Sequence, residues 1–207
     1  MGITKAQLTC RRYDVLGDLP EDLVPSIAKG LKQNTFRPPP AMVSKEESMG
    51  WTLYDNITET DFEQIDRWYV EPHVLFQLRI DKKTLPSKLF NADLQVEIRK
   101  FCAAKGYEKC PNSEKTAIKE RLKAEYLAKT MPSVRTAEVC WALDKGYVLF
   151  HNTSEAINNH FMKRFYESFG LRLSPYSPLS FVADDSRVMH TLKGAGASDL
   201  SFRRGEG

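Results

Sequence analysis

The spacing of apolar residues changes abruptly after Ile80, and this change limits the possible folds more than any other feature of the sequence. From Val74 to Ile80, apolar residues mostly occupy every second position, which predicts a strand with one buried face within residues 68–80. Beyond it they recur every three or four positions, which predicts two helices over about residues 87–105 and 112–129. Because strand patterns follow the second helix, this helical pair is an insertion between strands.

The rest of the chain alternates between strand and helix patterns. Further strands are expected over residues 3–15, 50–54, 135–143, 147–152 and 171–176. Further helices are expected after Asp18, which is predicted to be an N-cap, and after a capping box at residues 152–155. A turn at residues 144–146 contains Gly and favours a hairpin. This order predicts an α+β fold in which a mostly antiparallel sheet packs with amphipathic helices.

Three regions are expected from this order. An α+β core comprises residues 1–81 and 133–182, and an inserted helical basic arm comprises residues 82–132. From Ala183 onward the chain is polar and rich in Gly and Ser, so residues 183–207 are expected to form a flexible tail. A hydrophobic content of 42% in 207 residues is sufficient for a core of this size.

The predicted arm concentrates positive charge. Residues 82–132 contain 12 basic and 6 acidic residues, a net charge of +6, whereas the remaining residues together carry −3. Lysines at positions 115, 119 and 123 share one side of the predicted helix, because residues four apart are neighbours on a helix. Such a stripe binds phosphates by releasing condensed counterions, without reading sequence. We predict phosphate contacts from Lys115, Lys119, Lys123 and Lys129, supported by Lys82, Lys83, Arg121 and Arg135.

Several short segments occur in an order that resembles the RdgC recombination-associated family. They are Met49-Gly-Trp51, Leu85-Pro-Ser87, a basic helix beginning near Ser113, Trp141 followed by a Gly-containing turn, residues 152–156 opening a helix, and a closing run at residues 169–175. Each segment is common by itself. Their order and approximate spacing, over about residues 3–180, are what is similar to the family.

The resemblance implies a protein that binds double-stranded DNA without sequence preference. Members of the family dimerise into a ring whose basic inner surface surrounds the duplex, and they are linked to restraint of recombinase activity. They continue for a further domain, and they usually have an aromatic residue after the basic helix, where this chain has Met131-Pro132. These differences bear on ring closure and on contacts between arm tips more than on DNA binding, because the basic helices are present here.

Other functions stay open at this stage. Asp81-Lys82-Lys83 at a strand end has the D-x-K pattern of metal-dependent nucleases, although no second carboxylate stands in a recognisable partner motif. The basic arm also suits an accessory subunit that docks onto an acidic recombination protein, or onto a phage or host protein. The plainest alternative is a solvated helix face, in which Glu125 and Lys129 form an ordinary pair. Whether duplex or single-stranded DNA is preferred is left open by the sequence.

Little else in the sequence indicates chemistry. The four cysteines form no C-x-x-C pair and the four histidines no triad or metal motif, so we expect no catalytic residue, metal or cofactor. Trp51 and Trp68 are candidates for stacking on bases, whereas Trp141 and a stripe from Phe161 to Phe169 are expected in the core. Without a signal peptide or a long apolar run, the sequence predicts a cytoplasmic, nucleoid-associated protein with no membrane contact.

Overall fold

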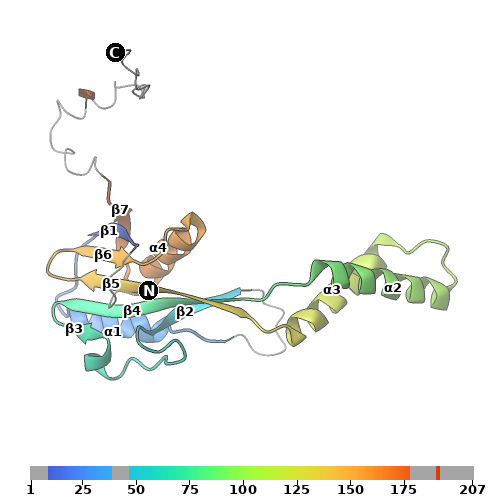
Figure 1. Cartoon of the computed structure of the whole chain (residues 1–207), viewed down its shortest axis with the longest axis horizontal. Coiled ribbons are helices and arrows are strands. Elements are labelled where there is room, and N and C mark those ends of the chain that lie inside the picture. The colour runs from blue at the N-terminus through green and yellow to red at the C-terminus, as the bar shows by residue number, and fades with distance from the viewer. Residues whose placement is uncertain (1–8, 39–46, 178–189, 192–207) are drawn as a thin grey trace, which may run out of the picture.

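A seven-stranded antiparallel sheet with two helices against one face forms the body of the molecule, and a pair of helices projects from it (Figure 1). The computed structural model describes residues 9–38, 47–177 and 190–191. The main elements are β1 (Arg11–Leu16), α1 (Leu23–Gln33), β2 (Glu47–Leu53), β3 (Tyr69–Val70), β4 (His73–Lys82), α2 (Ser87–Lys105), α3 (Asn112–Lys129), β5 (Ser133–Ala142), β6 (Tyr147–Phe150), α4 (Glu155–Phe169) and β7 (Arg172–Pro175). The predicted α+β class is confirmed.

The sheet is organised around its two longest strands. The strand order is β2-β4-β5-β6-β1-β7, and β3 pairs separately with β4. β4 and β5 pair antiparallel from His73 opposite Ala142 to Lys82 opposite Ser133. Beyond that last pair, β4 continues into α2 and β5 is entered from α3. The helical arm therefore leaves the body at the joined ends of two paired strands, as Figure 1 shows.

The prediction of one strand over residues 68–80 is wrong in its first half. The chain turns back after β3, so that Tyr69 pairs with Val74 in a short hairpin. Pro72 lies at this turn, where its missing N–H costs no ladder hydrogen bond. The predicted beginning of the first strand and nearly all of the predicted tail lie outside the described part of the chain.

The starts of two helices also differ from the predictions. Asp18 is not an N-cap, because α1 begins at Leu23 and follows Asp22, which makes no side-chain hydrogen bond to the helix. The capping box before α4 is not formed either. Ser154 makes no side-chain cap, and its backbone N–H donates to Oδ1 of Asn152 over 2.8 Å. Short polar side chains bind loop amides as readily as helix amides, and here the loop contact forms.

Aromatic rings from the sheet and α4 form the centre of the main core. Trp51 lies edge-on to Phe76 with ring centroids 5.0 Å apart, and its indole N–H donates to Ser168 Oγ over 2.7 Å. Phe161 stacks on Phe150 with ring centroids 3.9 Å apart. Together with a ring contact between Phe76 and Phe169, the aromatic layer ties α4 to the strands β2, β4 and β6.

All three tryptophans are buried in this body. The core positions predicted for Trp141, Phe161 and Phe165 are confirmed, since each is at most 1% exposed. Trp51 and Trp68 are fully buried, and the Trp68 indole N–H donates to Phe62 O over 3.1 Å. The suggestion that Trp51 or Trp68 stacks on bases is therefore wrong, because neither ring has a free face.

The arm has a small apolar core of its own. Phe90 and Leu94 of α2 pack with Ile118 and Leu122 of α3, and this cluster is separate from that of the body. Gly106 ends α2 with a φ of 68°, the left-handed conformation that its position after the helix predicts. The arm is thus a helical hairpin that is held together mainly by contacts within itself.

Gly30 provides a test of the α1–α4 contact. A Cβ at this position would clash with the backbone oxygen of Ser168, so Gly30→Ala should destabilise the fold by about 1–3 kcal/mol through overpacking. Helix propensity alone predicts the opposite sign, a gain of about 1 kcal/mol. Lys29→Ala, at an exposed position of the same helix, is the matched control. Urea unfolding of both variants decides, and a Gly30→Ala protein at least as stable as the wild type contradicts the close packing.

Candidate nucleic-acid interface

One long edge of the arm is neutralised by its own ion pairs. Arg121 donates to Glu97 Oε2 over 2.9 Å and so joins α3 to α2. Lys100 binds the other oxygen of Glu97 at 3.0 Å, and Tyr126 donates to Asp93 on the same edge. Arg121, predicted as a supporting phosphate contact, is thus already engaged by an acidic partner. Helical spacing does not reveal this partner, because Glu97 lies on the other helix.

The protonation states of this edge follow from those contacts. Hydrogen bonding and charge from Lys100, with a further contribution from Arg121, lower the pKa of Glu97 below its ordinary value. The hydrogen bond to Asp93 and partial burial raise the pKa of Tyr126. Both shifts favour an ionised Glu97 and a protonated Tyr126 at neutral pH. The edge therefore bridges the two helices and has little net charge left for an external ligand.

The opposite edge of α3 carries lysines instead. Lys119 and Lys123 lie two residues before and after Arg121, so each is rotated by about 160° from it around the helix. Lys115 precedes Lys119 by one turn and continues the stripe. Lys115 and Lys119 are exposed and form no ion pair with any described residue, whereas Lys123 is half-buried and interacts within the chain. The structure therefore brings the predicted stripe together on a single edge.

The lysines at the root of the arm have different roles. Lys83 is half-buried, and its ammonium donates to Leu127 O in the last turn of α3 over 2.6 Å. This hydrogen bond holds the last turn of α3 beside the end of β4, although the sequence predicted a phosphate contact for Lys83. Lys82 and Lys129 are exposed at the ends of β4 and α3. Both extend the cationic surface of the arm toward the body.

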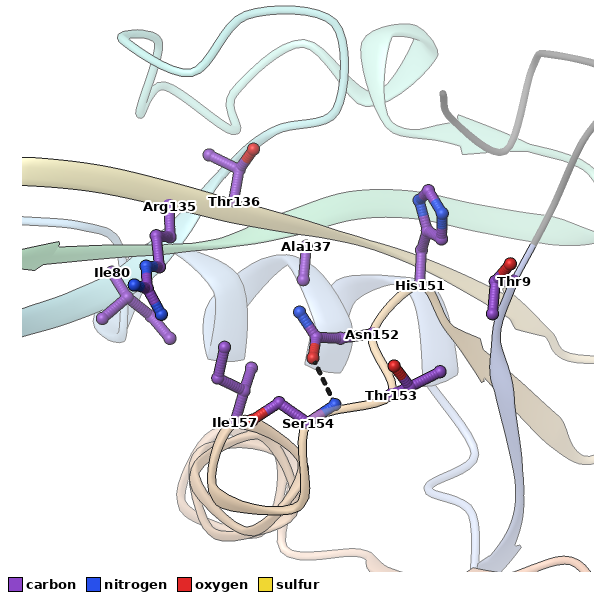
Figure 2. A pocket seen from close by; sticks show the side chains of 10 residues that line it. All are labelled: Thr9, Ile80, Arg135, Thr136, Ala137, His151, Asn152, Thr153, Ser154 and Ile157. Atoms are coloured by element: carbon purple, nitrogen blue, oxygen red, sulfur yellow. Dashed lines mark hydrogen bonds between the residues drawn. The ribbon is translucent and has the colours of Figure 1, made fainter.

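Arg135 stands apart from the stripe, in an open groove of about 520 Å³ between β5 and the first turn of α4 (Figure 2). Ile80 and Ala137 also line the groove, and Arg135 is its one Lys or Arg side chain among the lining residues. In Figure 2 the Arg135 side chain extends to the same side of the strand as Ser154, while the His151 ring points to the other side. Sequence spacing does not predict this groove, because its lining comes from four separate segments of the chain.

The candidate nuclease carboxylate is engaged within the fold. Both oxygens of Asp81 accept from the Arg79 guanidinium at 2.8 Å, and Asp81 is only 4% exposed. The Arg79 guanidinium also lies over the Phe36 ring, 4.2 Å from its centroid. Within the described ranges, no three His, Cys, Asp or Glu side chains are grouped so as to hold a metal ion. The D-x-K segment is thus part of a buried ion pair.

Comparison with known proteins agrees with this architecture. The family model described as "Putative exonuclease, RdgC" matches residues 19–191, which is well over half of the chain. The chain belongs to the RdgC family. No curated protein gives a significant match to it. The RdgC assignment confirms the resemblance found in the sequence, and it associates the chain with recombination. Among its described helices, none has the length and apolar character needed to cross a membrane.

The Glu97 bridge of this RdgC chain gives a prediction for pH dependence. The pKa of Glu97 is lower in the folded chain than its ordinary value. The ionised carboxylate therefore stabilises the fold at pH values above the ordinary Glu pKa, and this stabilisation is lost as the pH falls through the lowered pKa. Lys100→Met should raise the pKa of Glu97 more than Arg121→Met does, since Lys100 makes the larger contribution. NMR titration of the Glu97 carboxyl measures both shifts, and an ordinary pKa in the wild type would contradict the bridge.

The Lys83 hydrogen bond gives a second prediction. Lys83→Met should leave Leu127 O without its charged partner and lower the free energy of unfolding by about 1 kcal/mol. This loss is small for a hydrogen bond to a charged group, because the site is half-buried. The loss should appear as faster amide hydrogen exchange in the last turn of α3. Lys82→Met changes the same charge at the exposed neighbour and is the control. Equal rates of amide hydrogen exchange in the two variants would show that Lys83 does not stabilise the end of α3.

Proposed function

We propose that this RdgC-family chain binds double-stranded DNA without sequence preference through the lysine edge of its arm, and catalyses no reaction. The observation that supports this most directly is the division of charge on α3. Arg121 is neutralised on one edge, while Lys115 and Lys119 on the other form no ion pair within the described residues. The exposed charges of Lys115 and Lys119 therefore suit an external polyanion.

The spacing of the edge suits a phosphate backbone. From Lys115 to Lys123 the helix rises by about 12 Å, so the stripe spans several phosphate charges of a duplex. Affinity then comes from the release of condensed counterions, which depends on charge and not on base identity. Such binding is indifferent to sequence and weakens steeply as salt is added.

Duplex DNA is the preferred partner in this proposal. Proteins that hold single strands without sequence preference generally stack bases on aromatic side chains. Trp51, Trp68 and Trp141 are all buried in the body and cannot serve this purpose. The lysine edge contacts the backbone alone, and a duplex presents more backbone charge per unit length than a single strand.

A non-catalytic role is part of the proposal, although the description of the family model names an exonuclease. The pairing of Asp81 with Arg79 supports this role, because a carboxylate bound through both oxygens is poorly placed to hold a catalytic cation. The direct test is incubation of linear duplex DNA with the protein and Mg²⁺ or Mn²⁺. The proposal expects intact DNA, and release of nucleotides at a rate proportional to protein concentration would overturn it.

The family supplies further elements of the proposal. We infer a homodimer, because one arm covers little of a duplex, and a nucleoid-associated location in the cytoplasm. A protein partner from recombination is the second candidate, favoured by exposed apolar side chains on α2, where Leu89 is 57% and Val96 39% exposed. Salt-dependent binding to random DNA supports the first function, whereas indifference to DNA favours the second.

Lys119→Glu tests the lysine edge itself. This change should weaken binding to all duplex sequences alike and reduce the salt slope of log affinity by about 1 or more, since a phosphate contact is lost. Fluorescence anisotropy of random duplexes at several salt concentrations measures both quantities.

Two controls accompany this variant. Lys29→Glu makes the same charge change at an exposed position on α1, outside the arm, and Arg121→Ala removes a cation that is already neutralised. Both should leave the slope close to that of the wild type. An equal loss for Lys119→Glu and Lys29→Glu would mean that only net charge matters and that the edge is not the site.

A further inference from the structure

The groove that contains Arg135 differs in composition from the lysine edge of the arm. Its volume of about 520 Å³ lies within the range of about 300–1,000 Å³ that is usual for ligand pockets. Ile80 of β4, Ala137 of β5 and Ile157 of α4 give it an apolar lining. Arg135 is its one Lys or Arg side chain, and no Asp or Glu is among the lining residues that the structure describes. A positive charge therefore lies next to an apolar surface (Figure 2).

The guanidinium of Arg135 is available to a ligand. Arg135 is exposed on β5, and it makes no hydrogen bond or ion pair with another residue in the described part of the chain. Arg79 on the neighbouring strand differs, because its guanidinium is bound to both oxygens of Asp81. A guanidinium presents parallel N–H donors in a planar fork, so a free one matches a carboxylate through both oxygens.

The opposite wall of the groove is held in place from within the protein. Asn158, which is 1% exposed, donates to Asn152 O over 3.0 Å and to Ser154 O over 2.7 Å. Arg11 donates to Thr153 O over 3.1 Å. The Asn152 side chain turns its oxygen to the Ser154 N–H, and Figure 2 shows its nitrogen on the side of the sheet. Because these acceptors are already engaged, the wall offers mainly hydrogen-bond donors to a ligand.

We propose that the Arg135 groove binds the C-terminus of a partner peptide that ends in an apolar residue. The terminal carboxylate pairs with the Arg135 guanidinium, and the last side chain packs on Ile80, Ala137 and Ile157. Capture of a terminal carboxylate is a recurring mode of peptide recognition. Because the wall is formed before binding, little of the affinity is lost to ordering the site. This site goes beyond the proposed DNA contacts, since it holds a protein partner where the arm joins the body.

A phosphate of duplex DNA fits this groove less well than a peptide carboxylate does. A duplex is held by several cations along its backbone, and the groove has a single Lys or Arg side chain. Polar sugars flank each phosphate, so the apolar lining would gain little from covering them. A C-terminal residue instead carries its carboxylate and its side chain on one carbon atom. One group can therefore meet Arg135 while the other meets the apolar lining.

NMR titration of the full chain with a short peptide tests the proposal. The probe is an N-acetylated peptide of glycine and serine that ends in leucine with a free carboxylate, and the same peptide with a C-terminal amide is the comparison. The free acid should shift the Nε–H signal of Arg135 and the methyl signals of Ile80 and Ile157. The amide should bind about tenfold or more weakly, since a hydrogen bond between two charged groups is lost. Equal binding of the two peptides would overturn the proposal.

Matched variants identify the cation that binds the peptide. Arg135→Met should weaken binding of the free acid by about tenfold or more, and Arg135→Lys should cause a smaller loss, because it keeps the charge without the planar fork. Arg172→Met removes the same charge from an exposed position on β7, outside the groove, and should leave the affinity unchanged. An equal loss in Arg172→Met and Arg135→Met would show that only net charge matters, which contradicts the site.

Duplex binding by the same variants separates this site from the lysine edge. Arg135→Met should keep the wild-type affinity and salt slope for random duplexes, whatever the result for Lys119→Glu. Failure of the peptide to bind therefore leaves the DNA proposal standing, and the reverse also holds. A reduced salt slope in Arg135→Met, with no response of the wild type to the peptide, would assign the groove to DNA phosphates and overturn the peptide site.

Discussion

The ladder between β4 and β5 is the contact on which the rest of the structure depends. Its register places Phe76 opposite Val139 on the face that the helices cover, and the same register ends with Lys82 opposite Ser133, where the arm begins. A shift of one residue would turn every side chain of one strand to the other face. One set of backbone hydrogen bonds thus fixes both the hydrophobic core and the point from which the arm projects.

Most of the fold could be predicted because its signals are local and repeated. Alternation in β4, four-residue spacing in α2 and α3, and Gly106 after α2 each reflect the geometry of a single element. The incorrect predictions concern segments whose local sequence pattern is compatible with two different structures. Asp18 can cap a helix or remain in a loop, and an alternating run can turn back at Pro72 without losing its pattern. Contacts outside the segment decide such cases.

The candidate site was predictable in its charge but not in its pairing. Counting residues located the basic arm, and helical spacing placed Lys115 and Lys119 on one side of α3. The partners of Arg121 and Lys83 depend on how α2, α3 and β4 lie against each other, which a periodic pattern in one helix does not specify. Arg121 reaches Glu97 across the hairpin, and Lys83 reaches Leu127 O at the end of α3. Arg121 and Lys83, both predicted phosphate contacts, therefore have structural partners that only the folded arm reveals.

Salt acts on the lysine edge of the arm in two opposite ways. Like charges one turn apart on a helix cost about 0.2–0.5 kcal/mol per pair, whereas burying one large apolar side chain contributes about 1.5–3 kcal/mol. The cluster around Phe90 and Leu122 therefore outweighs the repulsion along the lysine edge, and the arm stays folded without a ligand. Added salt screens that repulsion and stabilises the free arm slightly, yet it would remove the counterion gain of the proposed DNA binding. A stripe that served only the fold would show the first effect without the second.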